Sequence, residues 1–219
     1  MPVKPYALRV RDVRKAYGSR QVLRGVSLDL RPGTLAGMVG ENGAGKTTLL
    51  RILCGQTAAG SGEVDIRGSL GYCPQETVLN DFLTVDQHVR YFQAAYGLPS
   101  TDRAEELIEE LHFAEYRRTR VDDLSGGTRQ KLNLTLALMH DPSVLLLDEP
   151  YQGFDWETYL RFWGLAGRLR DSGRCVLVVS HLAWDADRLD VLHRLREGVA
   201  EPWEPGGRTA SPAGDGGGR

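Results

Sequence analysis

Residues 40–48 read Gly-Glu-Asn-Gly-Ala-Gly-Lys-Thr-Thr and match the phosphate-loop pattern G-x-x-x-x-G-K-[ST]. The apolar run 35–39 precedes this stretch and the helical run 47–54 follows it, so the stretch joins a strand to a helix N-terminus. Glycines let backbone N–H groups approach a phosphate, and the helix N-terminus adds positive potential. We therefore expect a phosphate site here, with a plain Gly-rich turn as the structural alternative. The expected contacts are Gly40, Asn42, Gly43, Ala44, Gly45, Lys46, Thr47 and Thr48.

Two side chains at the end of this loop have the functional groups that phosphate and metal binding require. Lys46 can reach the outer phosphates as a point charge, and Thr47 offers its hydroxyl to Mg²⁺. These two roles predict that the loop binds a nucleotide together with a magnesium ion.

A pair of carboxylates follows a second apolar run. Residues 144–148 read Val-Leu-Leu-Leu-Asp, and Glu149 comes next. In open parallel sheets, ligands bind at the carboxyl ends of the strands. Asp148 is therefore expected to hold Mg²⁺, directly or through water, and Glu149 to orient or deprotonate a water that attacks the γ-phosphate. A surface turn without metal is the alternative, since Asp-Glu-Pro also suits a strand end.

Short apolar and alternating runs predict strands, and helical periodicity predicts helices between them. The predicted strands are 8–13, 26–30, 35–39, 63–67, 70–73, 144–148 and 175–180. The predicted helices are 47–54, 84–96, 102–113, about 127–139 and 156–170. Helix 84–96 opens with the capping-box pattern Thr-x-x-Gln, and helix 102–113 opens with Asp-x-x-Glu. The strand–helix–strand order of the last part indicates an α/β fold with parallel strands and helices on both faces.

The composition is that of a globular protein. Apolar residues make up 41% and charged residues 26% of the chain, which excludes collagen, coiled coil and wholesale disorder. Lys and Arg number 27 against 29 Asp and Glu, a balance that argues against a duplex-DNA binder, so we expect no nucleic-acid partner. No apolar run approaches the roughly 18 residues that span a bilayer. The N-terminus lacks a signal-peptide core, and the 3 separated cysteines fit a reducing cytoplasm.

Charge and composition vary along the chain. Residues 1–35 carry an excess of Lys and Arg, whereas residues 74–115 carry an excess of Asp and Glu. Either two differently solvated faces or a surface-exposed acidic subdomain would explain this contrast. Residues 202–219 contain no Val, Ile, Leu or Met and are rich in Gly and Pro. We expect them to form a disordered tail after a domain of residues 1–201.

A third motif indicates which class of phosphate-loop protein the chain resembles. Residues 124–130 read Leu-Ser-Gly-Gly-Thr-Arg-Gln and precede the predicted helix 127–139. Ser125 and the start of that helix would present a hydroxyl and free N–H groups to an anion, although a simple Ser N-cap satisfies the same pattern. The stretch resembles the signature motif of the ABC ATPases, which distinguishes them from other phosphate-loop proteins. The residues that this resemblance assigns to nucleotide contact are Ser125, Gly126 and Gly127.

The order of further motifs resembles the same family over about residues 5–200. Tyr17 resembles the aromatic residue that stacks on adenine, Gln75 the Q-loop glutamine, Asp155 the D-loop aspartate and His181 the switch histidine. An aromatic side chain at a strand edge and an incidental histidine after a strand are the structural alternatives for Tyr17 and His181. The D-loop region departs from the common family pattern, since it reads Tyr-Gln at 151–152 and Phe at 154.

The resemblance implies an ATP hydrolase that uses ATP and Mg²⁺. The implied catalytic residues are Glu149, His181 and Gln75, and the implied metal ligands are Thr47, Gln75 and Asp148. Tyr17 and Asp155 are implied to contact the nucleotide. The implied α/β fold is a phosphate-loop NTPase core with a parallel sheet, an N-terminal antiparallel β-subdomain and an inserted helical subdomain at about residues 76–140.

The resemblance also implies partners. In this family two ATP-binding subunits, identical or different, sandwich ATP between the phosphate loop of one and the signature of the other. They power a separate transmembrane permease, so the chain is expected in the cytoplasm, at the inner face of the membrane. The stretches 82–86 and 96–98 resemble those of exporters. The alternatives are an importer subunit or a soluble ABC ATPase of DNA repair, chromosome organisation or translation.

Overall fold

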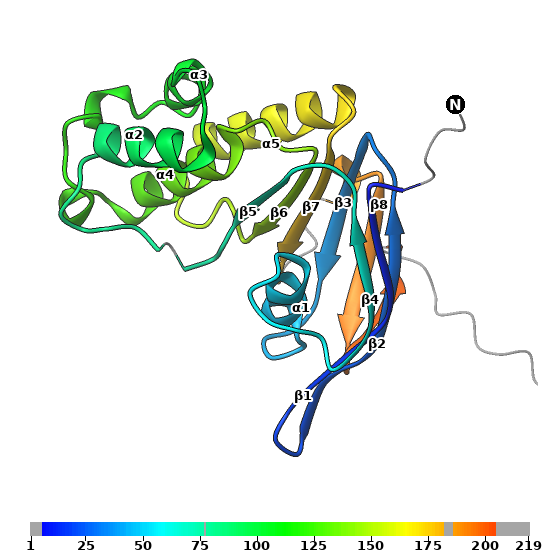
Figure 1. The fold of residues 1–219 in the computed structure, drawn as a ribbon. Helices are drawn as coiled ribbons and strands as arrows, with labels where there is room; N and C mark the ends of the chain where they lie inside the picture. The colour runs from blue at the N-terminus through cyan, green and yellow to red at the C-terminus, as the bar shows by residue number, and fades with distance from the viewer. Residues whose placement is uncertain (1–5, 77, 182–185, 205–219) are drawn as a thin grey trace, which may run out of the picture.

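The computed structural model describes residues 6–76, 78–181 and 186–204. Its centre is a six-stranded sheet with the order β5-β6-β7-β3-β8-β9 (Figure 1). The first five strands of that order run parallel, and β9 is antiparallel to β8. The strands are β5 (Leu70–Cys73), β6 (Val144–Asp148), β7 (Cys175–Ser180), β3 (Thr34–Val39), β8 (Val191–Arg196) and β9 (Val199–Pro202). The predicted parallel core is confirmed, and β8 and β9 are additions that the sequence did not predict.

A second, three-stranded antiparallel sheet has the order β2-β1-β4. It consists of β1 (Leu8–Tyr17), β2 (Arg20–Leu30) and β4 (Ser61–Ile66), and it confirms the expected antiparallel β-subdomain. Strand β1 runs four residues beyond the predicted end at 13. The reason is an irregular register next to Asp12, whose φ is 44°, since this break interrupts the apolar alternation on which the prediction relied.

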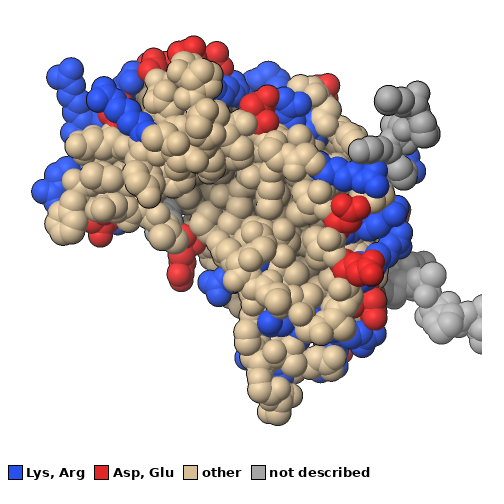
Figure 2. Space-filling view, in the orientation of Figure 1, with Lys and Arg blue, Asp and Glu red and all other residues tan. Residues whose placement is uncertain are grey.

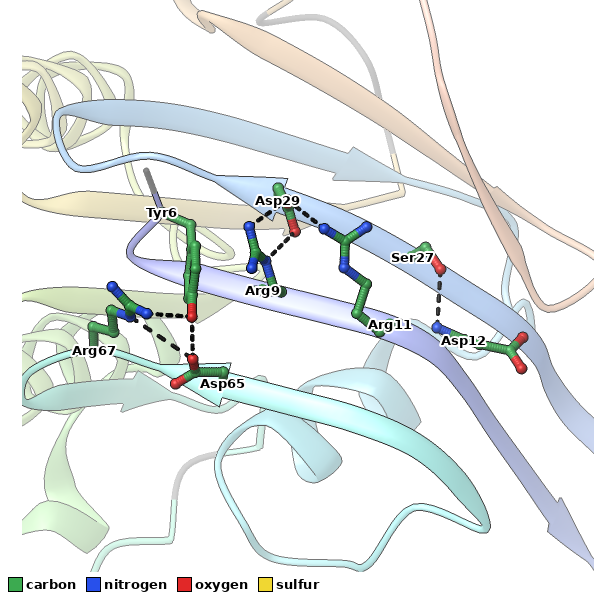
Figure 3. A network of polar contacts seen from close by, with 8 residues as sticks. All are labelled: Tyr6, Arg9, Arg11, Asp12, Ser27, Asp29, Asp65 and Arg67. Atoms are coloured by element: carbon green, nitrogen blue, oxygen red, sulfur yellow. Dashed lines mark hydrogen bonds and ion pairs between the residues drawn. The ribbon is translucent and has the colours of Figure 1, made fainter. Parts of the chain in front are cut away.

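Polar contacts brace the outer face of this sheet (Figure 3). The Tyr6 ring lies between two guanidinium groups, with the Arg9 and Arg67 carbons 3.7 and 3.9 Å from its centroid. The Tyr6 hydroxyl donates to Asp65 on β4 and accepts from Arg67. Asp29 on β2 accepts hydrogen bonds from Arg9 at 3.3 Å and from Arg11 at 3.0 Å. The network therefore joins all three strands through side chains as well as through the backbone.

The helices form two groups. Helix α1 (Lys46–Leu53) follows the phosphate loop, and α5 (Trp156–Asp171) packs against β3 and β7. The inserted helical subdomain lies to one side of the sheet (Figure 1). It contains α2 (Val85–Tyr96), α3 (Asp102–Glu110), α4 (Gly126–Leu138) and the short 3₁₀ helices Ala114–Tyr116 and Val121–Asp123.

Helix ends follow local capping chemistry. The capping box of α2 is confirmed, because Thr84 accepts from the Gln87 N–H while the Gln87 side chain accepts from the Thr84 N–H. Helix α3 begins at Asp102, as predicted, but it differs from the prediction in its cap and in its C-terminal end. Its N-cap is Thr101, without a side-chain cap bond, and it ends at Glu110 rather than 113. His112 has a φ of 52°, a left-handed conformation that a continuing α-helix cannot include.

The six-stranded sheet separates two apolar cores, because successive side chains of a strand point to opposite faces. Leu145, Leu147, Val176 and Val178 pack with α5 and the helical subdomain. Their neighbours Val144, Leu146, Leu177 and Val179 pack with α1 and the antiparallel sheet. The helical subdomain therefore shares its core with one face of the sheet.

Charged side chains gather at the edges of the face shown in Figure 2, over the antiparallel sheet and around α3. Of the acidic side chains of α3, Asp102, Glu105, Glu106 and Glu109 are exposed, and Glu110 is partly buried. On the antiparallel sheet, Arg9 and Arg11 pair with Asp29, and Arg14 pairs with Asp12. Part of the acidic excess of residues 74–115 thus lies on the exposed face of α3.

The C-terminal boundary needs a small correction. The predicted domain ends at 201, but Pro202 still pairs with His193 in β9. The Trp203 N–H donates to the Leu192 carbonyl at 2.8 Å, and the Arg194 guanidinium lies 5.8 Å from the Trp203 ring centroid. The fold therefore continues through Trp203. The rest of the predicted tail, 205–219, lies outside the described residues.

Candidate active site

A cleft of about 400 Å³ brings most of the predicted site residues together. It opens beside the phosphate loop, at the carboxyl ends of β3, β5 and β6, where ligands bind in parallel sheets. Its predicted lining residues are Tyr17, Asn42, Gly43, Gly45, Lys46, Thr47, Thr48, Gln75, Asp148 and Glu149. Two further lining residues, Arg20 and Val22, were not predicted. The remaining predicted residues lie outside the lining: Gly40, Ala44, Ser125, Gly126, Gly127, Asp155 and His181.

The phosphate loop depends on glycine at Gly43 and Gly45, whose φ angles are 82° and 106°. A Cβ on Gly45 would lie 2.8 Å from the Leu23 side chain, so the loop also packs closely against β2. The Lys46 ammonium donates to the carbonyls of Gly40 at 2.6 Å and Glu41 at 3.1 Å. Burial lowers the pKa of Lys46, against the opposing effect of the Glu149 and Asp148 carboxylates. The loop therefore holds a buried amine at the place where phosphates would enter.

Asp148 and Thr47 form the candidate metal site. The Thr47 hydroxyl donates to Asp148 Oδ2 at 3.1 Å, and Asp148 is only 1% exposed. Burial raises the pKa of Asp148, while the Thr47 hydrogen bond acts in the opposite direction. Within the described residues no group of three or more His, Cys, Asp or Glu side chains could hold a metal. One carboxylate and one hydroxyl, completed by nucleotide phosphates and water, are nevertheless a donor set that fits Mg²⁺.

Glu149 turns away from the strand that carries it. Its φ of 49° is left-handed, and its N–H donates to the Val179 carbonyl at 2.9 Å. This turn directs the carboxylate to His181, whose Nδ1 lies 2.8 and 2.9 Å from the two carboxylate oxygens. Because a carboxylate accepts, Nδ1 carries the proton in this contact. The Glu149 side chain is 10% exposed and that of His181 is 48% exposed, so the pair lies at the mouth of the cleft.

The signature motif caps α4 rather than lining the cleft. Ser125 Oγ accepts from the Thr128 N–H at 3.1 Å, as the structural alternative for this motif predicted. Gly127 packs against the loop before α5, since a Cβ there would lie 2.3 Å from the Gly153 carbonyl oxygen. Ser125 and Gly126 are exposed and remain accessible from outside the chain.

Asp155 caps the next helix. Its carboxylate accepts from the Thr158 N–H at 2.8 Å and from the Thr158 hydroxyl at 2.9 Å. These hydrogen bonds lower the pKa of Asp155, and the bond from the Thr158 backbone N–H has the larger effect. The side chain is therefore engaged within its own helix.

Arg20 and Val22 escaped prediction because neither belongs to a recognisable motif. Both lie at the start of β2, just after Tyr17 in the hairpin that joins β1 to β2. Arg20 Nη2 lies 3.6 Å from the position that a Cβ on Gly43 would take. The sequence offered only an indirect signal. If Tyr17, the last residue of β1, lies at the cleft, the first residues of β2, which follow it across the hairpin turn, must lie there as well.

Comparison with known proteins gives one consistent result. A family model described as "ABC transporter" matches residues 23–152. The chain is 35% identical to Nod factor export ATP-binding protein I of Cupriavidus metallidurans, over 83% of this chain and 65% of that protein. It is 30% identical to linearmycin resistance ATP-binding protein LnrL of Bacillus subtilis, over 80% of this chain and 61% of that protein. The chain thus spans less than two thirds of these relatives.

Solved structures agree. A structure titled as the ATP binding subunit of an ABC transporter superimposes with a TM-score of 0.83 at 25% identity, covering 90% of both chains. The dimeric ABC transporter cassette MJ0796 gives a TM-score of 0.81 at 25% identity, covering 89% of this chain and 96% of that one. The fold therefore matches that of ABC transporter cassettes over about 90% of the chain.

Proposed function

Because the chain belongs to the ABC transporter family of ATP-binding cassettes, whose members hydrolyse ATP, we propose that it binds ATP with Mg²⁺ in the cleft and hydrolyses it to power a transmembrane permease. This proposal rests on one observation: Lys46, Thr47, Asp148 and Glu149 all line the same cleft. A cationic loop and adjacent carboxylates at strand ends are the elements that phosphoryl transfer to water requires.

In this mechanism each residue has a separate task. The loop N–H groups and Lys46 hold the phosphates, while Tyr17, half exposed at the cleft edge, offers its ring to the base. Thr47 and Asp148 would hold Mg²⁺, which would supply charge neutralisation at the phosphates. Glu149 accepts the proton of the attacking water, and the Nδ1–H of His181 orients that carboxylate. Gln75, which lines the same cleft, would contact the water or the metal.

A second ATP-binding subunit, identical or different, completes the site. Ser125, Gly126, Gly127 and Asp155 do not line the cleft of their own chain. The exposed Ser125 at the N-terminus of α4 instead suits the phosphates of a nucleotide bound to a partner. The similarity to a cassette solved as a dimer supports this arrangement.

The permease partner and the export direction rest on separate observations. No helix of the described chain has the length and apolar character that crossing a bilayer requires. Val78, Phe82 and Tyr91, which follow Gln75 along the chain, are 86%, 75% and 65% exposed, an apolar set suited to a partner protein. Export is favoured because similar proteins are named for Nod factor export and linearmycin resistance. We place the chain at the cytoplasmic face of the membrane, held there by its permease.

Phosphate release by the purified chain tests the catalytic part of the proposal. Turnover should require Mg²⁺, stop on chelation, and fall together with ATP affinity in Lys46→Ala, since the lost charge acts on bound phosphates and in the transition state. Turnover that is indifferent to both Mg²⁺ and Lys46 would refute the proposed site. Co-purification from detergent-solubilised membranes then tests the partner, because a transport subunit should elute with a membrane protein.

A further inference from the structure

Resting on the proposed function, we propose that Tyr151 is a positioning residue for ATP hydrolysis: its hydroxyl anchors Ser180 and thereby fixes His181 against the Glu149 carboxylate. Tyr151 is one of the positions at which this chain departs from the common family pattern, and its hydroxyl is the group that makes the contact.

The contacts form a closed ring around the catalytic carboxylate. The Tyr151 hydroxyl donates to Ser180 Oγ at 3.1 Å. Ser180 is the last residue of β7, it is 6% exposed, and the next residue is His181. His181 Nδ1 returns to Glu149 at 2.8 Å. Glu149 precedes Tyr151 by two residues, so two short covalent segments and two hydrogen bonds enclose the site.

The Tyr151 ring is itself held by other aromatic side chains. Its centroid lies 5.4 Å from that of Tyr159, 5.6 Å from Phe162 and 5.9 Å from Trp163, all on α5. Rings at these distances and inclined to one another make favourable edge contacts. The hydroxyl is therefore presented from a fixed platform, rather than from a flexible surface side chain.

The backbone around Glu149 explains why such an anchor matters. The turn of residues 149–152 is closed by the Gln152 N–H, which donates to the Glu149 carbonyl at 3.2 Å. Glu149 has a left-handed backbone conformation, which costs energy in a residue other than glycine. His181 is half exposed, and burial alone does not hold its ring in place. Fixing Ser180 fixes the backbone from which His181 projects, and a general base needs such support from its surroundings.

The test is a double-mutant cycle with Tyr151→Phe and Ser180→Ala. Phe keeps the ring and its packing and removes only the hydroxyl. We expect kcat about fivefold lower, the rate equivalent of one hydrogen bond of about 1 kcal/mol. The KM for ATP should stay within about twofold, because phosphate and base contacts are untouched. The double variant should be no slower than the slower single variant, since both remove the same bond.

Two further measurements separate positioning from general stability. In a Glu149→Gln background, Tyr151→Phe should leave the residual single-turnover rate unchanged, because the anchor acts only through the carboxylate. Tyr116→Phe, on the helical subdomain, is the matched control and should change nothing. The inference is overturned by unchanged kcat in Tyr151→Phe, by additive effects, or by kcat that falls in step with the melting temperature. A wild-type chain without ATPase activity would refute the proposed function instead.

Discussion

Asp148 and Glu149 are neighbours in sequence, but their surroundings assign them different chemistry. Asp148 continues the strand, is 1% exposed and accepts from the Thr47 hydroxyl. Glu149 has a φ of 49°, which swings its carboxylate to the cleft mouth beside His181. One carboxylate is thus buried next to a hydroxyl that can share a metal. The other is also buried, at 8% exposure, but it lines the cleft beside the half-exposed His181, where a water can reach it.

Glu149→Gln should retain ATP binding while turnover falls by about 10²–10⁴-fold, the usual contribution of a general base. The amide has nearly the same shape but cannot accept the proton, and Asp148 is the residue proposed to hold the metal. Steady-state phosphate release and nucleotide affinity are to be measured on one preparation. Turnover close to that of the wild type would remove Glu149 from its role, and a large loss of affinity would show that Gln disturbs binding.

Asp148→Asn should raise the melting temperature of the nucleotide-free protein at neutral pH. Burial raises the pKa of Asp148 above its unfolded value, so its ionisation opposes folding once the pH rises through the folded pKa. Asn cannot ionise and still accepts from Thr47. The gain should therefore disappear below about pH 4, where Asp is protonated even in the unfolded chain. Melting curves from pH 4 to 8 for both proteins check this, and a constant difference across that range would contradict it.

At the scale of elements, the first turn of α4 meets the loop before α5. Helix α4 begins at Gly126 with Ser125 as its cap, and α5 begins at Trp156 with Asp155 as its cap. The loop before α5 touches the first turn of α4, where a Cβ on Gly127 would approach the Gly153 carbonyl oxygen to 2.3 Å. No flexible side chain can yield at this contact, because the opposing atom belongs to the backbone.

Gly127→Ala should therefore destabilise the protein, although alanine favours helices more than glycine does. Overpacking of this kind costs about 1–3 kcal/mol, which corresponds to a fall in melting temperature of roughly 2–10 °C for a domain of this size. Gly126→Ala is the matched control, because a Cβ there meets nothing within 4 Å. Equal melting temperatures for the two variants would show that the loop before α5 simply moves aside.

Local patterns predicted several elements of the fold, including two that line the cleft. The phosphate loop, the strand that ends at Asp148 and the capping box at Thr84 each depend on residues close together in sequence. Strand β8 was missed because half of its side chains are basic or histidine, so it lacks the apolar run that identified β6 and β7. The Tyr151–Ser180 contact joins residues 29 positions apart and depends on strand register, which no single segment encodes.

At the scale of the whole molecule, the proposed sandwich gives each chain two unlike halves of a nucleotide site. The cleft contains Lys46 and Glu149, while the exposed Ser125 caps α4 outside its lining. Two chains arranged head to tail would bring each half against its complement. The proposed sandwich can therefore be tested by damaging one half at a time.

Lys46→Ala and Ser125→Arg should each give a nearly inactive protein, because every site of either homodimer has one defective half. Mixing the two variants with subunit exchange should restore part of the ATPase activity. In the mixed dimer both defects fall in one site, and the other site keeps an intact Lys46 and an intact Ser125. Ser125→Arg also removes a helix cap worth about 1 kcal/mol, so melting curves must show that both variants are folded.

Exchange is to be confirmed with two affinity tags, one on each variant. Proven mixed dimers that remain inactive would mean either that Ser125 acts within its own chain or that both sites must be intact. A covalently linked pair with both substitutions on one chain separates these cases. It is inactive if Ser125 acts across the dimer, whereas action within a chain leaves one complete site.

The shared core described above limits how this protein can be divided or recombined. The apolar side of the helical subdomain is completed by Leu145, Leu147, Val176 and Val178 from the sheet. Excised as an isolated fragment, residues 76–140 would expose that surface to water and should not fold alone. A chimaera that imports a relative's helical subdomain must import the matching sheet face with it. Evolution faces the same constraint, so changes that adapt the helical subdomain to a new permease must spare its inner surface or be matched by changes in β6 and β7.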